Sequence, residues 1–244
     1  MSILTHFSDK DIGNLQSYKH SCDDKSILSK RVLTPFWIRV SSVLPSSITP
    51  NMITLFGGAF MMAVFIFTLF TADNFLTTHV SAFHSLLAGF AFFVFNTTDG
   101  VDGIHARRTK QSSPLGDLLD HAVDSLVYLF GSILIVAVLV PVNPILCFCT
   151  IASALISALA MEVEYLVTKS LRFGVVSAPV EGVLGAAFLG FIGFLNIDFY
   201  AGTLSCFGFK LSYGTLTLIL MMALFVFSSL NSFISCLIYS LETG

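Results

Sequence analysis

The sequence predicts an all-α integral membrane protein with about six transmembrane helices and an N-terminal interfacial helix. Hydrophobic residues make up 55% of the 244-residue chain and charged residues only 11%, whereas a soluble domain carries about 25% charged residues. The mean hydropathy is +0.86, and six apolar stretches approach the length of ~20 residues that crosses a bilayer. The net charge of −3 gives no indication of a nucleic-acid partner.

The chain before the first span divides into two segments. Residues 1–32 are polar, mixed in charge and without the apolar core of a secretory signal, so we expect a cytosolic segment and an uncleaved signal anchor in the first span. Residues 33–48 mix Phe36, Trp37, Arg39 and Val43 and are too short to span. This mixture predicts an amphipathic helix at the membrane interface, with a disordered linker as the alternative. Residues 49–241 then form the membrane domain.

Six stretches are candidates for spanning helices. Pro114 suits the first turn of the third span, and Pro141 and Pro144 bracket a tight link before the fourth. We place the spans at about 52–71, 82–98, 114–140, 144–167, 179–195 and 213–237.

The basic residues predict the orientation of these spans. Eleven of the twelve Lys and Arg residues precede the first span or lie between the second and third or the fourth and fifth; only Lys210 falls on the opposite side. Cytoplasmic loops are enriched in Lys and Arg, so we expect these three regions and both termini to face the cytosol. The five cysteines contain no CxxC pair, which is typical of reduced, buried thiols rather than of a zinc site.

Aspartates concentrate where the second span meets the third. Acidic residues in membrane helices are costly and need a specific reason. Five lie within 26 residues: Asp99, Asp102, Asp117, Asp120 and Asp124. Asp99 and Asp102, three residues apart, share one helix face, and Asp120 and Asp124, four apart, share a face of the next helix. The short link at 107–113 turns the chain back, so two carboxylate pairs should confront each other at the membrane interface.

Opposed carboxylate pairs call for cations. Mg²⁺ takes oxygen ligands and keeps positions open for phosphate, and a two-metal clamp on a phosphoryl group is a common use of such a site. The alternative is that the aspartates cap helices or pair with Arg107 and Arg108, but three nearby basic residues are too few for five carboxylates. An unrelated channel or transporter would line several helices with polar residues, whereas these gather at one interface.

The same residues carry a family resemblance. The run Asp99-Gly-Val-Asp102-Gly103-Ile-His-Ala106-Arg107, followed after eight residues by Gly116 and then by Asp120 and Asp124, resembles the signature of the CDP-alcohol phosphotransferase family. The resemblance implies a six-helix catalytic core, a CDP-alcohol bound by the motif, and two metal ions, Mg²⁺ or Mn²⁺, held by these four aspartates. Residues 50–54, 107–116, 119–125, 171–174 and 179–182 resemble the choline/ethanolaminephosphotransferase branch, whose members are longer chains.

The resemblance assigns the nucleotide to particular residues. Gly103, Ala106, Arg107 and Gly116 should line the CDP portion, and a guanidinium such as that of Arg107 binds phosphate bidentately. A glycine also permits close approach by a ligand or by a neighbouring helix. Asn51 stands at the mouth of the first span, where it either contacts the nucleotide or caps the helix.

His121 lies between Asp120 and Asp124 in the sequence. In the choline/ethanolamine branch a histidine at this place is proposed as the general base, and imidazole titrates near neutral pH. We expect His121 to take the proton of the lipid hydroxyl; a structural role for it, or Asp124 or a base outside the motif acting instead, are the alternatives. Glu162, Glu164 and Glu181 are further acids. Of these, Glu181 is the candidate for the cationic head group, with a salt bridge to Lys169 or Arg172 as the alternative.

The resemblance predicts transfer of phosphocholine or phosphoethanolamine from CDP-choline or CDP-ethanolamine to diacylglycerol, with release of CMP, the last step of the Kennedy pathway. It also predicts the endoplasmic reticulum or Golgi membrane as the location and leaves a homodimer open. The alternatives are a phosphatidyltransferase that uses CDP-diacylglycerol, of the phosphatidylinositol or phosphatidylglycerophosphate type, and a non-catalytic membrane scaffold.

Overall fold

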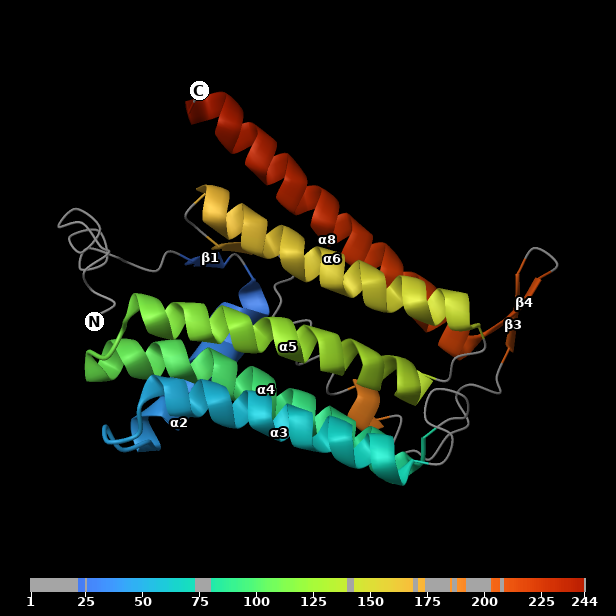
Figure 1. Cartoon of the computed structure of the whole chain (residues 1–244), viewed down its shortest axis with the longest axis horizontal. Coiled ribbons are helices and arrows are strands. Elements are labelled where there is room, and N and C mark those ends of the chain that lie inside the picture. The colour runs from blue at the N-terminus through green and yellow to red at the C-terminus, as the bar shows by residue number, and fades with distance from the viewer. Residues whose placement is uncertain are drawn as a thin grey trace, which may run out of the picture.

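The protein is a bundle of long helices (Figure 1). The computed structural model describes residues 22–24, 26–72, 80–139, 143–168, 171–173, 185, 188–191, 203–206 and 209–243. A π-helical turn at Ser29–Leu33 precedes the helices α2 (Thr34–Val43), α3 (Pro50–Thr71), α4 (Ala82–Thr109), α5 (Pro114–Leu139), α6 (Pro144–Thr168) and α8 (Tyr213–Thr243). The strands are β1 (Cys22–Asp24), β2 (Leu171–Phe173), β3 (Thr203–Cys206) and β4 (Phe209–Ser212).

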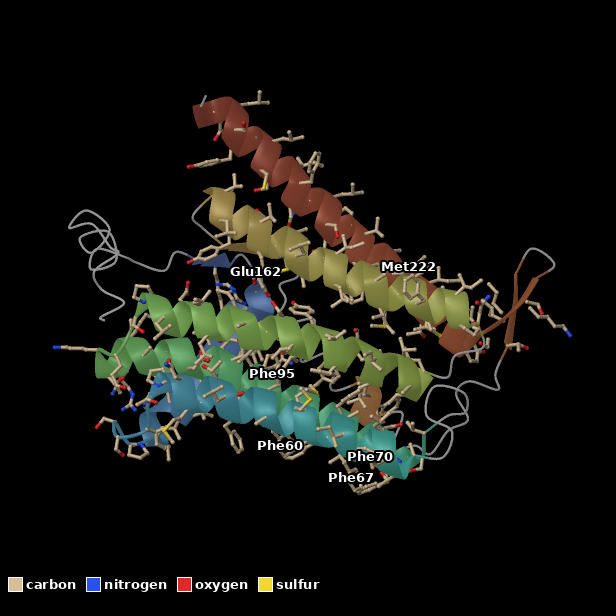
Figure 2. All side chains as sticks on the ribbon, in the orientation of Figure 1. Phe60, Phe67, Phe70, Phe95, Glu162 and Met222 are labelled. Carbon is tan, nitrogen blue, oxygen red and sulfur yellow. The ribbon has the colours of Figure 1, made fainter. Side chains whose placement is uncertain are left out.

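The long helices form two groups that meet at α5. Helices α3, α4 and α5 lie side by side, and α6 packs against α5 and along α8 (Figure 1). The main buried cluster fills the first group and includes Met61, Ala88, Ala91, Val127 and Leu134. On the outer side of α3, Phe70 projects away from the bundle (Figure 2) and is 81% exposed. An apolar side chain this exposed suits a helix surrounded by lipid.

The described helices confirm an all-α integral membrane protein. Among them, α3, α5, α6 and α8 are long and apolar enough to cross a membrane. The residues of the predicted second span, 82–98, form the N-terminal part of α4, a helix of 28 residues that is not one of these four and carries polar residues throughout its C-terminal half. The predicted fifth span, 179–195, lies largely outside the described residues, so the count of six stays approximate. The sequence did not predict the two short sheets, in which β1 pairs with β2 in parallel and β3 with β4 antiparallel.

The helix ends follow local chemistry. Pro50 and Pro114 each open a helix, where the missing N–H costs nothing. The N-terminus of α6 is capped by Asn143, whose Oδ1 accepts hydrogen bonds from the N–H groups of Ile145 (2.9 Å) and Leu146 (3.3 Å). Lys110 ends α4 with φ 59°, a left-handed conformation that stops a helix. Only three residues then separate it from α5, so α4 and α5 return antiparallel.

The segment predicted as an interfacial helix forms α2, which is shorter than the predicted 33–48. Its Trp37 is 6% exposed and packs with Leu33, Ile53 and Val101. A Cβ added at Gly100 would come within 2.7 Å of Cζ2 in the Trp37 ring, so the indole ring lies directly on the backbone of α4. The disordered alternative is therefore wrong for α2, while its place at the membrane interface and the boundaries 1–32 and 49–241 stay predictions.

Candidate active site

The aspartates of α4 and α5 meet near the turn that joins the two helices. One carboxylate oxygen each from Asp99, Asp120 and Asp124 lies within 4.8 Å of the other two. The carboxylates approach one another because Asp120 and Asp124 share one face of α5, and the tight turn at Lys110 brings that face against α4. Three carboxylates this close repel one another strongly in a partly buried site. A bound cation would offset this repulsion, so the cluster could hold a metal ion.

Asp102 joins the cluster from the next turn of α4. It is 5% exposed, and its carboxylate interacts electrostatically with those of Asp120 and Asp99. The hydroxyl of Thr54, on α3, donates a hydrogen bond to Oδ2 of Asp102. A third helix thus fixes the orientation of this carboxylate, in the way that outer hydrogen bonds orient metal ligands.

The donor set fits a hard divalent cation. Carboxylate oxygens are the ligands that Mg²⁺ and Mn²⁺ prefer, and the cluster supplies no thiolate or imidazole to favour a softer ion. Among the residues that the structure describes, the contacts of Arg108 do not support the alternative that it pairs with the aspartates. Its Nη2 donates to the carbonyl oxygen of Leu44 (2.7 Å) and lies 3.2 Å from Nδ1 of His105. Arg108 therefore holds the chain between α2 and α3 against α4.

Two glycines of the predicted nucleotide site lie under polar side chains. A Cβ added at Gly103 would lie 3.2 Å from Nη1 of Arg107, which places the guanidinium over that stretch of backbone. A Cβ added at Gly116 would lie 3.1 Å from Oδ1 of Asn51. Helices α3 and α5 thus bring Asn51 and Gly116 together, although 64 residues separate them in the chain. Ala106 is 9% exposed and lies in the packed part of α4, so its predicted contact with the nucleotide stays a prediction.

His121 faces α6 rather than α4. Its Nδ1 lies 2.9 Å from Oε1 of Glu162, a side chain on the part of α6 that faces α5 (Figure 2). The ring of Tyr165 packs on the imidazole with centroids 5.1 Å apart and planes 31° apart. The hydroxyl of Tyr165 donates to Oδ2 of Asp117 (3.0 Å), and the same oxygen lies 3.8 Å from Nε2 of His121.

Sequence reasoning left some of these partners without a role. The sequence indicates Glu162 only as one of three further acids for a head group or a salt bridge, and it predicts no functional role for Thr54 or Tyr165. The available signal was an acid within an otherwise apolar helix, which needs a partner, but α6 also contains Glu164, and the sequence does not show which one faces α5. Glu181, the predicted head-group residue, and Lys169 lie outside the described residues, as does the side chain of Arg172.

The amino-acid sequence is similar to those of known proteins. Residues 47–241 match the profile of a family described as CDP-alcohol phosphatidyltransferase. Choline/ethanolaminephosphotransferase 1 of Saccharomyces cerevisiae is 40% identical over 129 residues, which cover 51% of this chain and 33% of the relative. Ethanolaminephosphotransferase 1 of Homo sapiens is 38% identical over 132 residues, which cover 51% of this chain and 33% of that relative.

A plant relative matches over a longer stretch. Choline/ethanolaminephosphotransferase 1 of Arabidopsis thaliana is 33% identical over 172 residues, 70% of this chain and 43% of the relative. The chain therefore spans less than half the length of each of these three curated relatives.

Proposed function

The chain belongs to the CDP-alcohol phosphatidyltransferase family, and from this premise we propose that it transfers phosphocholine or phosphoethanolamine from a CDP-alcohol to diacylglycerol. The names of the relatives support phosphocholine or phosphoethanolamine as the transferred group. The observation that carries the chemistry is the approach of Asp99, Asp120 and Asp124 to within 4.8 Å of one another. His121 directly follows Asp120 in the sequence. A cation site beside a nitrogen base is what phosphoryl transfer to a hydroxyl needs.

The four aspartates at positions 99, 102, 120 and 124 are the proposed metal ligands, for two ions of Mg²⁺ or Mn²⁺. Bound there, the ions would neutralise the pyrophosphate and the charge that develops on it during transfer. The contribution of the protein is a fixed and partly buried donor set. Thr54 fixes one of these ligands from a different helix, so the site is formed before the substrate arrives.

The nucleotide is proposed to lie along the turn between α4 and α5. Arg107 would bind a phosphate oxygen pair through its guanidinium. Gly103 and Gly116 have no side chain to fill the space next to Arg107 and Asn51, respectively. Ala106 is proposed to contact the nucleotide beside them. Glu181 is proposed, on sequence grounds alone, to face the cationic amine of the head group.

The transfer step assigned to His121 is an in-line displacement. Diacylglycerol enters from the bilayer, and an imidazole nitrogen of His121 takes the proton of its free hydroxyl. The oxygen forms a bond to the β-phosphorus as the bond from that phosphorus to the bridging oxygen breaks. CMP leaves with the electron pair. Asp124 as the base is the competing assignment within the same site.

We also propose that the active site faces the cytosol, that the membrane is that of the endoplasmic reticulum or Golgi, and that the chain can form a homodimer. The distribution of basic residues supports the first of these.

The test uses the full chain, purified in lipid nanodiscs that contain diacylglycerol. CMP release and phospholipid formation are measured with CDP-choline, CDP-ethanolamine, and CDP-diacylglycerol supplied with inositol or glycerol 3-phosphate. Turnover with either of the first two donors is expected, and in H121A it should fall by orders of magnitude to a low but measurable rate. Near-normal turnover of H121A would remove His121 as the base. Turnover with CDP-diacylglycerol alone would identify the other branch, and metal binding without CMP release from any donor would indicate a scaffold.

A further inference from the structure

Glu162 makes the most specific contact in the site outside the aspartate cluster. It joins two helices, since His121 belongs to α5 and Glu162 to α6, 41 residues later. Its Oε1 lies 2.9 Å from Nδ1 of the imidazole. The other ring nitrogen, Nε2, is buried and makes no hydrogen bond among the residues that the structure describes; its nearest carboxylate oxygen there, Oδ2 of Asp117, is 3.8 Å away and so beyond hydrogen-bond distance. The two nitrogens of one ring are thus in different environments.

We propose that Glu162 is the positioning residue of His121: its carboxylate accepts the Nδ1–H and so holds Nε2 as the nitrogen that takes the proton. An ionised carboxylate has no hydrogen to donate, so the nitrogen beside it must carry the proton. In a neutral imidazole the proton is then absent from Nε2, whose lone pair is free to act as a base. This inference rests on the proposed function, and it adds which nitrogen reacts and what selects it.

A second contact holds the plane of the ring. Tyr165 is three residues after Glu162, so both side chains leave α6 on the side that faces α5. The phenol ring packs against the imidazole, and its hydroxyl is bonded to Asp117 (3.0 Å), one helical turn before His121. A carboxylate at one edge and an aromatic ring on one face together restrict rotation about both side-chain torsions of the histidine. This matches the general need for a second group that orients a catalytic base.

The geometry favours this role over a direct contact between Glu162 and the head group. An oxygen of Glu162 is already within hydrogen-bond distance of the imidazole, and the side chain is only 32% exposed. Glu162 also interacts electrostatically with Asp124, so its charge acts on the aspartate cluster as well as on the imidazole.

The test compares E162Q with a matched control, E164Q. Glu164 lies on the same helix, is 5% exposed, and interacts electrostatically with Cys236 on α8, away from His121. Glutamine at position 162 keeps the shape of the side chain, but its NH₂ group can donate to Nδ1. Nδ1 would then carry no proton, and the neutral imidazole would hold its proton on Nε2, which could no longer act as the base. The equivalent Asp-to-Asn change in the serine-protease triad lowers kcat by about 10⁴-fold. We expect E162Q to lower kcat by about 10²-fold or more, with the KM for the CDP-alcohol and the affinity for Mn²⁺ unchanged.

Two further variants separate positioning from other roles. E162D keeps the charge but shortens the side chain, and we expect its kcat to lie between those of E162Q and the unchanged protein. If only the length of the side chain mattered, E162D would lose at least as much kcat as E162Q. In an H121A background, E162Q should cause no further loss, because residues that act as one unit are non-additive. Equal rates for E162Q, E164Q and the unchanged protein, or additive losses in the double variant, would overturn the assignment of Glu162. An unchanged protein that turns over neither CDP-choline nor CDP-ethanolamine would instead overturn the proposed function, and this inference with it.

Discussion

The three carboxylates that lie within 4.8 Å of one another predict that the cluster destabilises the protein when no metal is bound. We consider Asp99→Asn, which keeps the size of the side chain and removes one charge. Two unit charges 4.8 Å apart repel by about 3.5 kcal/mol at an effective dielectric constant of about 20. Asp99 faces both Asp120 and Asp124 at this separation or less, so the change relieves about 7 kcal/mol of repulsion between ionised groups, and proton uptake by the unchanged cluster reduces this gain.

The expected result is a reversal of the order of stability. Without metal, D99N should unfold at a higher temperature than the unchanged protein, by several degrees, since a domain of this size shifts by about 2–4 °C per kcal/mol. With saturating Mg²⁺ the unchanged protein should gain stability through mass action, and D99N, with a ligand missing, should gain much less.

The assay is thermal unfolding in detergent, followed by tryptophan fluorescence. Trp37 is the only tryptophan of the chain, and it is buried against the backbone of α4, so its emission reports on the helix that carries Asp99. E242Q, at an exposed position near the end of α8, serves as the charge-matched control. The reasoning is refuted if D99N is no more stable than the unchanged protein in EDTA, or if Mg²⁺ stabilises both equally.

Three further changes test how the site is held. Thr54→Val removes the hydrogen bond to Asp102 and should weaken Mn²⁺ binding about 10- to 100-fold, as measured by calorimetry; unchanged affinity would show that Asp102 needs no support from α3. Gly100→Ala places a methyl group against the Trp37 ring and should cost about 1–3 kcal/mol, seen as a red shift of the Trp37 emission together with a lower unfolding temperature. Gly116→Val narrows the space at the start of α5 and should raise the KM for the CDP-alcohol more than it lowers kcat; an equal effect on both would argue against nucleotide contact there.

Side-chain spacing was sufficient to predict the aspartate cluster. Residues three or four apart on a helix share a face, and a link of a few residues forces the next helix to return. The meeting of Asp99 with Asp120 and Asp124 therefore follows from local geometry alone. The roles assigned to these residues in metal and nucleotide binding are still predictions, because no measurement on the chain tests them.

The contacts across distant helices were beyond the reach of the sequence. The pairs Thr54–Asp102 and His121–Glu162 are 48 and 41 residues apart, and each depends on the rotation of a helix about its own axis. That rotation is set by the packing of the whole bundle. For the same reason the sequence did not predict that the ring of Trp37, which is only 6% exposed, covers the backbone of α4 at Gly100.

The two faces of α5 explain why His121 lies next to the aspartate cluster without being part of it. Successive residues of a helix turn by about 100°, so Asp120 with Asp124 and Asp117 with His121 form two rows that are offset by about 60°. The first row meets α4, where the other aspartates lie, and the second meets α6, where Glu162 and Tyr165 lie. A phosphate bound at the first row and a hydroxyl presented at the second would both touch α5 within one helical turn. A single rigid helix can thus fix the distance between the cation site and the base, and a change that rotated α5 would disturb both rows at once.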